Sequence, residues 1–295
     1  MKTFRTVVAG LIIVFSNVSG HAFAESFTLE FDVDGTSRNA IIQMPEGAGD
    51  GPYPLIMIFH GGGGSAHRMQ RVSEDFARSL NYGGYVVAFM NGTARRNTRN
   101  LRTWNADHCC AYAADEHIDD AAYVNAVYAA LTARTPIIED EIYLFGHSNG
   151  AMLSYRIASD LSFTPDALVI VSGAMFEDQP TLPRGTSILA IHTRDDETLS
   201  FSGDGDRSAR HRTAPILAFD DVRDRLEAMQ SCGDRETNTQ LNATLITGAA
   251  CENGGRVVTL VSDEGGHAWP KDLPGVHLDG FILGFLRGER GSVPQ

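Results

Sequence analysis

Short apolar runs alternate along the chain with stretches in which apolar residues recur at helical spacing. Six runs, at 55–59, 85–90, 141–145, 167–171, 187–192 and 256–262, predict strands buried in a parallel sheet. Helices are expected at 65–80, 117–134, 151–157, 215–230 and 276–286. Two segments at 26–31 and 38–44, separated by the Asp34-Gly35 turn signal, predict an opening hairpin. Strands that alternate with helices indicate an α/β fold with a mostly parallel sheet.

The pentapeptide Gly146-His147-Ser148-Asn149-Gly150 lies between the strand at 141–145 and the helix-compatible stretch that follows. In that position the G-x-S-x-G pattern predicts the nucleophile elbow of an α/β-hydrolase, a sharp turn that holds the central serine in a strained conformation. The two glycines leave the room that such a turn requires. We therefore interpret Ser148 as a catalytic nucleophile rather than a plain loop serine.

A serine nucleophile needs a histidine to take its proton and an acid to orient that histidine. In this fold the chain order is serine, acid, histidine. Asp195 and Asp196 follow the strand at 187–192 and are both candidates for the acid. His267 follows the last strand, within Gly265-Gly266-His267, and is the predicted base.

An oxyanion hole requires two backbone N–H groups aimed at the developing negative charge. One is expected from Asn149, which follows the nucleophile, and the other from the glycine run at 61–64 after the first buried strand. A phosphate-binding loop is the rival interpretation. The run lacks the Gly-Lys-Ser/Thr ending of a Walker motif and any dinucleotide fingerprint, so no nucleotide or other cofactor is expected.

The first residues are typical of a secretory signal peptide rather than of the fold. Lys2 and Arg5 precede a short apolar segment, and Ala22-Phe23-Ala24 offers a small-x-small cleavage site. Residues 1–24 are therefore predicted to be removed, which leaves 25–295 as a single catalytic domain secreted to the periplasm or the medium, without a membrane anchor. Cleavage would shift the net charge from −13 to −15, which argues against nucleic acid or anionic membrane as a partner.

Export makes the four cysteines potential disulfide partners. We expect a local pairing, Cys232 with Cys251 and the adjacent Cys109 with Cys110; two cross-bridges between these segments are the alternative. The first bond would close a loop of about 20 residues, worth roughly 3 kcal/mol in the chain-entropy model. No C-x-x-C pair stands near a histidine pair, so no metal site is expected.

Residues 91–116 read as a long irregular insertion after the strand at 85–90, where ligands bind in open α/β sheets. Trp104 and four arginines (Arg95, Arg96, Arg99, Arg102) suggest a basic rim beside an aromatic surface that favours esters carrying a carboxylate. The alternative is that the arginines pair with surplus acids and Trp104 packs the loop. Asp119 and Asp120, at the start of the next helix, are interpreted as structural.

Six blocks, "FHGGGGS", "RTWNADHCC", "IDDAAYVNA", "FGHSNGAM", "IHTRDD" and "GGHAWP", occur in an order that resembles the secreted polyhydroxybutyrate depolymerase-like esterases, close to feruloyl and acetyl-xylan esterases. The resemblance spans nearly the whole chain after the signal peptide and implies an α/β-hydrolase fold. It implies Asp196 rather than Asp195 as the acid, although Glu197 stands where the family has proline. It also implies Gly62 as the second oxyanion donor and Trp269 beside the acyl pocket.

The resulting prediction is a monomeric, secreted serine esterase that acts on a soluble ester or oligomer, such as a hydroxyalkanoate oligomer or a feruloyl or acetyl ester. Two other classes stay open: a non-catalytic binding protein with a hydrolase fold, and a serine peptidase on the same fold. Every position of the predicted triad holds a chemically competent residue, which disfavours the first. No propeller or large cap domain is evident, which disfavours the second.

Overall fold

The computed structural model describes residues 25–96, 101–205, 207–208, 211–241, 244–269 and 272–288. The predicted signal peptide, residues 1–24, lies outside this part of the chain and stays a prediction. Within the described residues, no helix is both long and apolar enough to cross a membrane.

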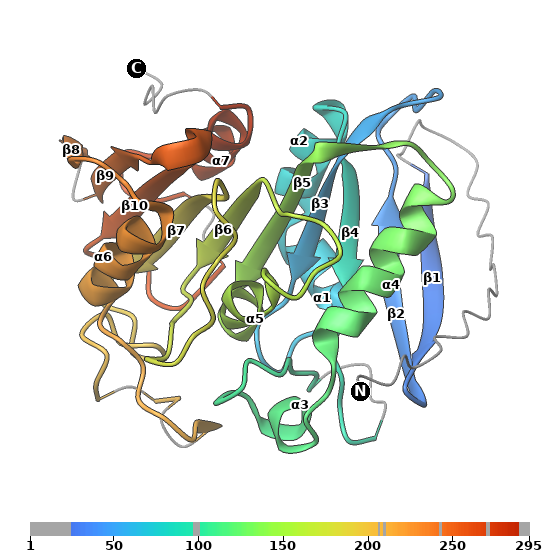
Figure 1. Cartoon of the computed structure of the whole chain (residues 1–295), viewed down its shortest axis with the longest axis horizontal. Coiled ribbons are helices and arrows are strands. Elements are labelled where there is room, and N and C mark those ends of the chain that lie inside the picture. The colour runs from blue at the N-terminus through green and yellow to red at the C-terminus, as the bar shows by residue number, and fades with distance from the viewer. Residues whose placement is uncertain are drawn as a thin grey trace.

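One twisted sheet runs through the molecule, with strand order β1-β2-β4-β3-β5-β6-β7-β10-β9-β8 (Figure 1). The six strands from β4 to β10 in that order run parallel to one another. At each end of the sheet two further strands are added, β2 and β1 at one end and β9 and β8 at the other, and each of them is antiparallel to the strand before it. The mostly parallel sheet predicted from the sequence is therefore confirmed. The strands are β1 (Ser26–Val33), β2 (Thr36–Gln43), β3 (Tyr53–Phe59), β4 (Val86–Met90), β5 (Ile137–His147), β6 (Ala167–Val171), β7 (Ser187–Thr193), β8 (Glu236–Leu241), β9 (Thr244–Ala250) and β10 (Arg256–Ser262).

Helices cover both faces of the sheet, because the central strands are apolar on both sides. Leu55, Met57 and Phe59 of β3 belong to the core on one face, and Ile56 and Ile58 to the core on the other. The first core is closed by α4 (Asp120–Thr132), α5 (Asn149–Ile157) and α6 (Phe219–Gln230), which lie on the near face in Figure 1. The second is closed by α1 (Ala66–Val72), α2 (Glu74–Tyr82) and α7 (Leu278–Leu286).

Several predicted helices begin or end at other residues in the structure, and local hydrogen bonds or dihedral angles account for two of these differences. The expected helix at 65–80 is two helices that meet at Ser73, where the backbone (φ −110°, ψ 23°) departs from helical values. The Met69 carbonyl accepts both the Ser73 hydroxyl (2.8 Å) and the Ser73 N–H (3.0 Å), an arrangement that often bends helices. Val72, which ends the first of these helices, is 47% exposed. The helix expected from residue 117 begins only at Asp120, because His117 has a positive φ and the Asp119 carboxylate caps the Ala122 N–H (2.8 Å).

The segment 91–116 is more ordered than its sequence indicated. It contains a short helix, α3 (Ala111–Asp115), and Thr93 pairs with Thr103 in an isolated antiparallel bridge. The two-residue turn of the opening hairpin is confirmed, with Asp34 and Gly35 both at positive φ as such turns require. The helix expected at 215–230 begins at Phe219.

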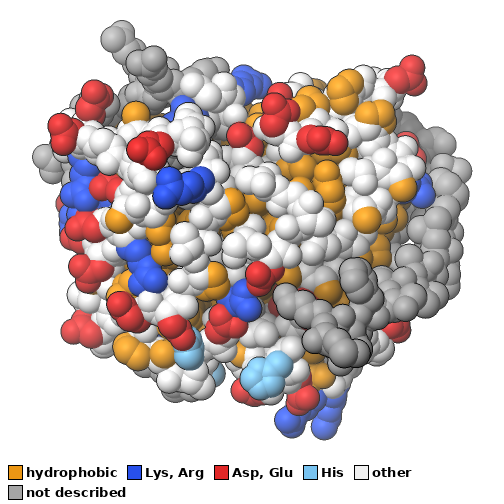
Figure 2. Space-filling view, in the orientation of Figure 1, with side chains coloured by type: hydrophobic (Ala, Val, Ile, Leu, Met, Phe, Trp, Pro, Cys, Tyr) orange, Lys and Arg blue, Asp and Glu red, His pale blue; other side chains and the backbone are white. Residues whose placement is uncertain are grey.

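Charged side chains of both signs are interspersed over the face shown in Figure 2. On α6, for example, Arg223 pairs with Asp220 at 2.7 Å and with Asp224 at 3.1 Å. Exposed pairs of this kind contribute little to stability, about 0–1 kcal/mol each. They show, however, that many basic groups of this acidic chain have acidic neighbours.

Candidate active site

Ser148 lies on the tight turn between β5 and α5. Its backbone adopts φ 55° and ψ −121°, a strained conformation for a residue with a side chain. A Cβ at Gly146 would approach the Ala151 nitrogen to 2.5 Å, and one at Gly150 would approach the Phe59 carbonyl oxygen to 2.5 Å. The two glycines of the pentapeptide therefore allow the turn to pass close to the first turn of α5 and to the end of β3.

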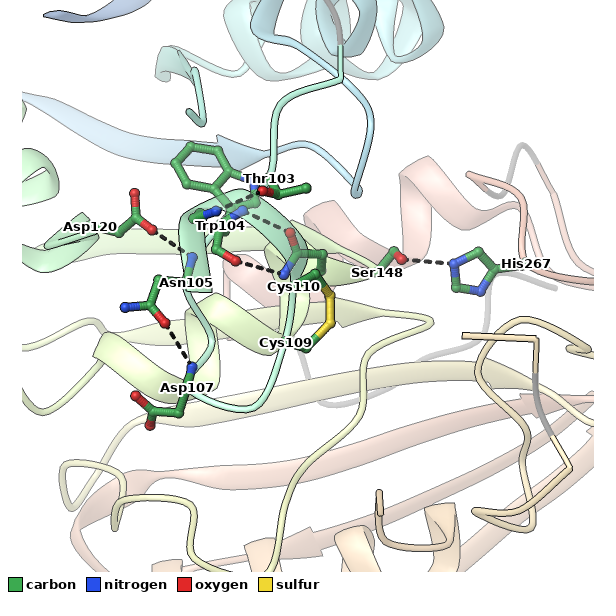
Figure 3. Close-up of a disulfide and its surroundings, with 11 residues drawn as sticks. Thr103, Trp104, Asn105, Asp107, Cys109, Cys110, Asp120, Ser148 and His267 are labelled. Carbon is green, nitrogen blue, oxygen red and sulfur yellow. Dashed lines mark hydrogen bonds between the residues drawn. A yellow bond between two sulfur atoms is a disulfide. The ribbon is translucent and has the colours of Figure 1, made fainter. Parts of the chain in front are cut away.

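The serine faces His267, as Figure 3 shows. The Nε2 atom of His267 lies 2.8 Å from the Ser148 Oγ, and its Nδ1 lies 2.8 Å from the Asp196 Oδ2. Three elements supply these residues: the turn after β5, the turn after β7 and the turn after β10. Parallel strands end at one edge of the sheet, so side chains 119 positions apart in sequence form one hydrogen-bonded chain.

Asp196 is the aspartate that contacts the histidine. Its side chain has no exposed area, and its second oxygen accepts the N–H groups of Thr198 (2.8 Å) and Leu199 (2.9 Å). Burial raises the pKa of this carboxyl, but the hydrogen bond and charge of His267 lower it, and the net pKa lies below the ordinary value. The carboxylate is therefore ionised at neutral pH.

Asp195 points to the backbone of the same histidine-bearing turn. Its carboxylate accepts the N–H of Gly266 (2.8 Å) and, at 3.2 Å, the N–H of Gly265, the two residues before His267. A slight burial raises the pKa of Asp195, but these backbone donors lower it, and the net pKa is below the ordinary value. The two adjacent aspartates thus hold one histidine in different ways, one by its ring and one by its backbone.

The two predicted oxyanion donors are neighbours. Asn149 is the first residue of α5, where backbone N–H groups have no acceptor within the helix. Gly62 is exposed, and a Cβ placed on it would lie 3.6 Å from the Asn149 Cβ. Among the described residues, the Gly62 N–H has no backbone acceptor. Two N–H groups are thus available close to the serine.

The structure contradicts the prediction that Trp104 forms an aromatic surface for substrate. Its side chain is 0% exposed, stacked against Tyr123 and in edge contact with Phe59. Its Nε1–H donates to the His60 carbonyl at 2.8 Å. The alternative interpretation, that Trp104 packs the loop, agrees with the structure.

Fewer arginines than predicted are exposed on the 91–116 segment. Arg102 is only 8% exposed, and its guanidinium donates to the Gly92 carbonyl (2.8 Å), so it belongs to the interior of the loop. Arg95 and Arg96 are exposed, and Arg99 lies outside the described residues. The preference for anionic esters therefore stays a prediction that concerns Arg95 and Arg96.

Trp269 is partly buried, with its ring 4.7 Å from that of Phe145 and 6.3 Å from that of Phe76. These contacts attach the histidine-bearing turn to β5 and to α2. Its predicted place beside the acyl pocket stays a prediction.

His147 is a residue of this region that the sequence analysis missed. Its Nε2 lies 3.1 Å from the His267 carbonyl oxygen and donates to it. Burial lowers the pKa of His147 to about 4, with a smaller effect from His267, so the ring is neutral. A Cβ at Gly61 would lie 2.8 Å from the His147 Nδ1, so the glycine loop leaves room for this ring. The only signal in the sequence was its place inside the pentapeptide.

Both predicted disulfides are present. Cys109 bonds to Cys110 near Ser148, as Figure 3 shows, and Cys232 bonds to Cys251. The local pairing is therefore confirmed, and the cross-bridged alternative is wrong. Asp119 caps α4 and Asp120 pairs with Arg38 at 2.7 Å in the interior, so both have the structural roles expected of them.

Comparisons with known proteins agree with this geometry. No family model matches the chain. Over 249 residues, covering 77% of this chain and 67% of the relative, it is 27% identical to "Putative esterase NocK" of Nocardia uniformis subsp. tsuyamanensis.

Solved structures share the fold at low sequence identity. An S-formylglutathione hydrolase from Agrobacterium tumefaciens has 10% identity and a TM-score of 0.57, over 93% of this chain and 95% of that one. Acetyl xylan esterase from Aspergillus awamori has 12% identity and a TM-score of 0.55, over 88% and 99%. A complex of a pOPH variant with pNPB has 14% identity and a TM-score of 0.58, over 88% and 84%. The chain has the α/β-hydrolase fold.

Proposed function

We propose that this protein is a serine esterase that hydrolyses carboxylic esters through an acyl-enzyme. The observation that carries the proposal is the unbroken chain of 2.8 Å hydrogen bonds from the Ser148 Oγ through His267 to the buried Asp196. The strained elbow, the two available N–H groups beside it and the similarity to a relative named as an esterase support the same conclusion.

In the acylation step, His267 Nε2 takes the Ser148 hydroxyl proton while Oγ bonds to the ester carbonyl carbon. The carbonyl oxygen becomes an oxyanion, which the N–H groups of Gly62 and Asn149 stabilise. His267 then donates that proton to the leaving alcohol as the carbon–oxygen bond breaks. Asp196 stays ionised and accepts the Nδ1–H, which fixes the tautomer and stabilises the imidazolium.

Deacylation repeats these roles with water. His267 removes a proton from a water molecule, whose oxygen attacks the acyl carbon, and returns the proton to Oγ as the serine leaves. Asp195 takes no part in proton transfer. By accepting from Gly265 and Gly266, it holds the turn from which the imidazole projects.

The proposed substrate is a soluble ester or short oligomer outside the cytoplasm, of the hydroxyalkanoate, feruloyl or acetyl type. The predicted signal peptide and the two disulfides support export. Action as a monomer, without nucleic acid or membrane as partner, is part of the same proposal. The solved esterase similar in fold is named for acetyl xylan, and that specificity belongs to that protein.

Replacing the nucleophile is the direct test. Ser148→Ala should lower kcat on p-nitrophenyl esters by on the order of 10⁴-fold or more, because the residues of a triad act as a unit. Ser154→Ala is the matched control: Ser154 lies on α5, is buried, and donates only to the Gly150 carbonyl (3.0 Å). It should keep wild-type turnover.

A fluorophosphonate probe gives an independent readout, since it should modify Ser148 in the wild type and leave Ser148→Ala unlabelled. Ester turnover by Ser148→Ala at the wild-type rate would refute the mechanism. A wild-type protein that neither turns over any short ester, feruloyl ester or hydroxybutyrate oligomer nor reacts with the probe would instead be a non-catalytic binding protein.

A further inference from the structure

We propose that Trp104 is a positioning residue that fixes the two oxyanion donors, Gly62 and Asn149, relative to each other. The inference rests on the proposed esterase function. Trp104 is the residue that the sequence placed at the substrate surface and the structure places in the interior. Its hydrogen bonds reach both sides of the oxyanion hole.

On one side, the main chain of Trp104 holds the side chain of Asn149. The Trp104 N–H donates to Asn149 Oδ1 at 2.8 Å, and Asn149 Nδ2 donates to the Trp104 carbonyl at 3.1 Å. Asn149 is 2% exposed, so water does not compete with these bonds. The residue that carries the first oxyanion donor is therefore attached to Trp104 at two points.

On the other side, the indole of Trp104 holds the start of the glycine loop. Its Nε1–H donates to the His60 carbonyl at 2.8 Å, two residues before Gly62. The His60 ring is in turn fixed, since its Nε2 accepts the Gly92 N–H (3.0 Å) and its Nδ1 donates to the Gly61 carbonyl (2.8 Å). One residue thus links the segments that carry the two donors.

The glycine loop needs such a support, because glycines have wide conformational freedom. Gly63 has a φ of 75°, and nothing lies within 4 Å of the place where its Cβ would be. The segment leading to Trp104 constrains the loop again, since the Gly63 N–H donates to the Arg102 carbonyl at 2.8 Å. An oxyanion hole is effective only if its donors are already oriented when the charge develops.

Trp104 is itself held by the interior. Its ring lies 5.4 Å from that of Phe59 and 5.7 Å from the guanidinium of Arg38. The N–H of the next residue, Asn105, donates to a carboxylate oxygen of Asp120 (2.8 Å), as Figure 3 shows, and the other oxygen of Asp120 pairs with Arg38. Moving Trp104 would disturb a buried ion pair, so it serves as a fixed reference point.

The test is Trp104→Phe, which keeps an aromatic ring and the main-chain bonds to Asn149 but removes the donor to His60. We expect kcat on a p-nitrophenyl ester to fall about 10- to 100-fold, because a displaced donor stabilises the transition state less. KM should stay within about twofold, since the substrate does not contact Trp104. Affinity for a boronic acid, which mimics the tetrahedral intermediate on Ser148, should fall in parallel with kcat/KM.

Tyr123→Phe is the matched control. Tyr123 stacks on Trp104 in the same interior. The variant removes a hydroxyl that donates to the Asn39 carbonyl (2.5 Å) and accepts the Asn91 N–H (3.2 Å). Its lost hydrogen bonds are to Asn39 and Asn91, not to His60, Gly62 or Asn149, so the variant should keep kcat and boronate affinity even if Tm falls. Equal losses of kcat in the two variants would overturn the inference, since they would reflect destabilisation of the interior.

A second replacement at position 104 tests the inference if Trp104→Phe does not fold. In 3-benzothienylalanine, sulfur replaces the indole N–H and the bicyclic shape is retained, so this residue at 104 should give the same loss of kcat. Wild-type kcat and boronate affinity in either folded variant, or a rise in KM alone, would overturn the inference. If Ser148→Ala is inactive in the same assays, such a result would overturn only the role of Trp104. If Ser148→Ala is active, the proposed esterase function would be overturned as well.

Discussion

The two sides of Ser148 are built on different principles. On the proton-transfer side, side chains are the working groups: His267 contacts the serine through one ring nitrogen and Asp196 through the other. On the oxyanion side, the working groups that we propose are the backbone N–H groups of Gly62 and Asn149. Every residue except proline has such a group. Their usefulness depends on orientation alone, and residues that never touch the substrate, above all Trp104, supply it.

This difference determines how each side responds to substitution. Removing a working side chain deletes a chemical group, so the effect on the rate is large and specific to that residue. A backbone donor remains after substitution and can only be displaced, so the effect is graded and spread over the residues that hold it. The predictions below separate these two kinds of response.

The largest effect is expected at the acid. Asp196→Asn should lower kcat by about 10³- to 10⁴-fold, because an amide neither selects the required tautomer of His267 nor stabilises its imidazolium. Asp195→Asn should cost about tenfold or less, since the amide oxygen can still accept one of the two backbone N–H groups. Steady-state kinetics on one p-nitrophenyl ester compares them. A larger loss of kcat in Asp195→Asn than in Asp196→Asn would identify Asp195 as the acid. The hydrogen bond between Asp196 and His267 would then belong to an inactive arrangement.

Removal of each disulfide should have an effect of intermediate size, on kcat in one case and on stability in the other. The Cys110 N–H donates to the Trp104 carbonyl (3.1 Å), which also accepts from Asn149, so Cys109→Ser with Cys110→Ser should lower kcat about three- to tenfold by loosening the oxyanion side. Its stability should change little, because bonding adjacent residues closes almost no loop.

Removing the other disulfide should do the opposite. Cys232→Ser with Cys251→Ser should lower the free energy of unfolding by about 3 kcal/mol, because the bond spans 19 positions, and leave kcat unchanged. Urea unfolding and kinetics on both double variants distinguish the cases. Equal changes in kcat and in the free energy of unfolding in the two double variants would show that the Cys109–Cys110 bond does not support the oxyanion side.

Per pH unit, the smallest expected effect on stability is the contribution of His60. Burial, opposed by the bond to Gly61, lowers the pKa of His60 to about 4, whereas the unfolded chain has the ordinary value of 6.5. Between these values the unfolded state binds a proton that the folded state does not, so stability falls as the pH falls and is fully present above 6.5. The loss from this one group is limited to about 1.4 kcal/mol per pH unit.

His60→Gln should therefore make the free energy of unfolding less dependent on pH between 6.5 and 4, although its absolute value will also be lower. Urea titrations of both proteins at several pH values measure this difference, and groups common to the two proteins cancel. An unchanged slope would mean that His60 binds its proton in the folded state.

Much of the fold and of the proton-transfer side could be predicted from the sequence, because the signals are local. The strands at 167–171 and 256–262 follow from apolar runs that are buried on both faces, and the structure has the same limits. The elbow depends on five consecutive residues, and the order of serine, acid and histidine places Ser148 and His267 at one edge of a parallel sheet. Adjacent or nearby cysteines favoured the local disulfides in the same way.

What the tertiary structure alone decided involves partners distant in sequence. Chain order left both Asp195 and Asp196 open as the acid, and only the family resemblance favoured Asp196. In the structure, the Asp196 carboxylate faces the ring of a histidine 71 positions away, and the Asp195 carboxylate faces the backbone of the same turn. Trp104 was predicted to face substrate because its loop follows the carboxyl end of a strand, yet its partners lie 44 and 45 positions away, at His60 and Asn149. A residue type indicates which bonds a side chain can make, but the packing of the whole chain determines which of them are formed.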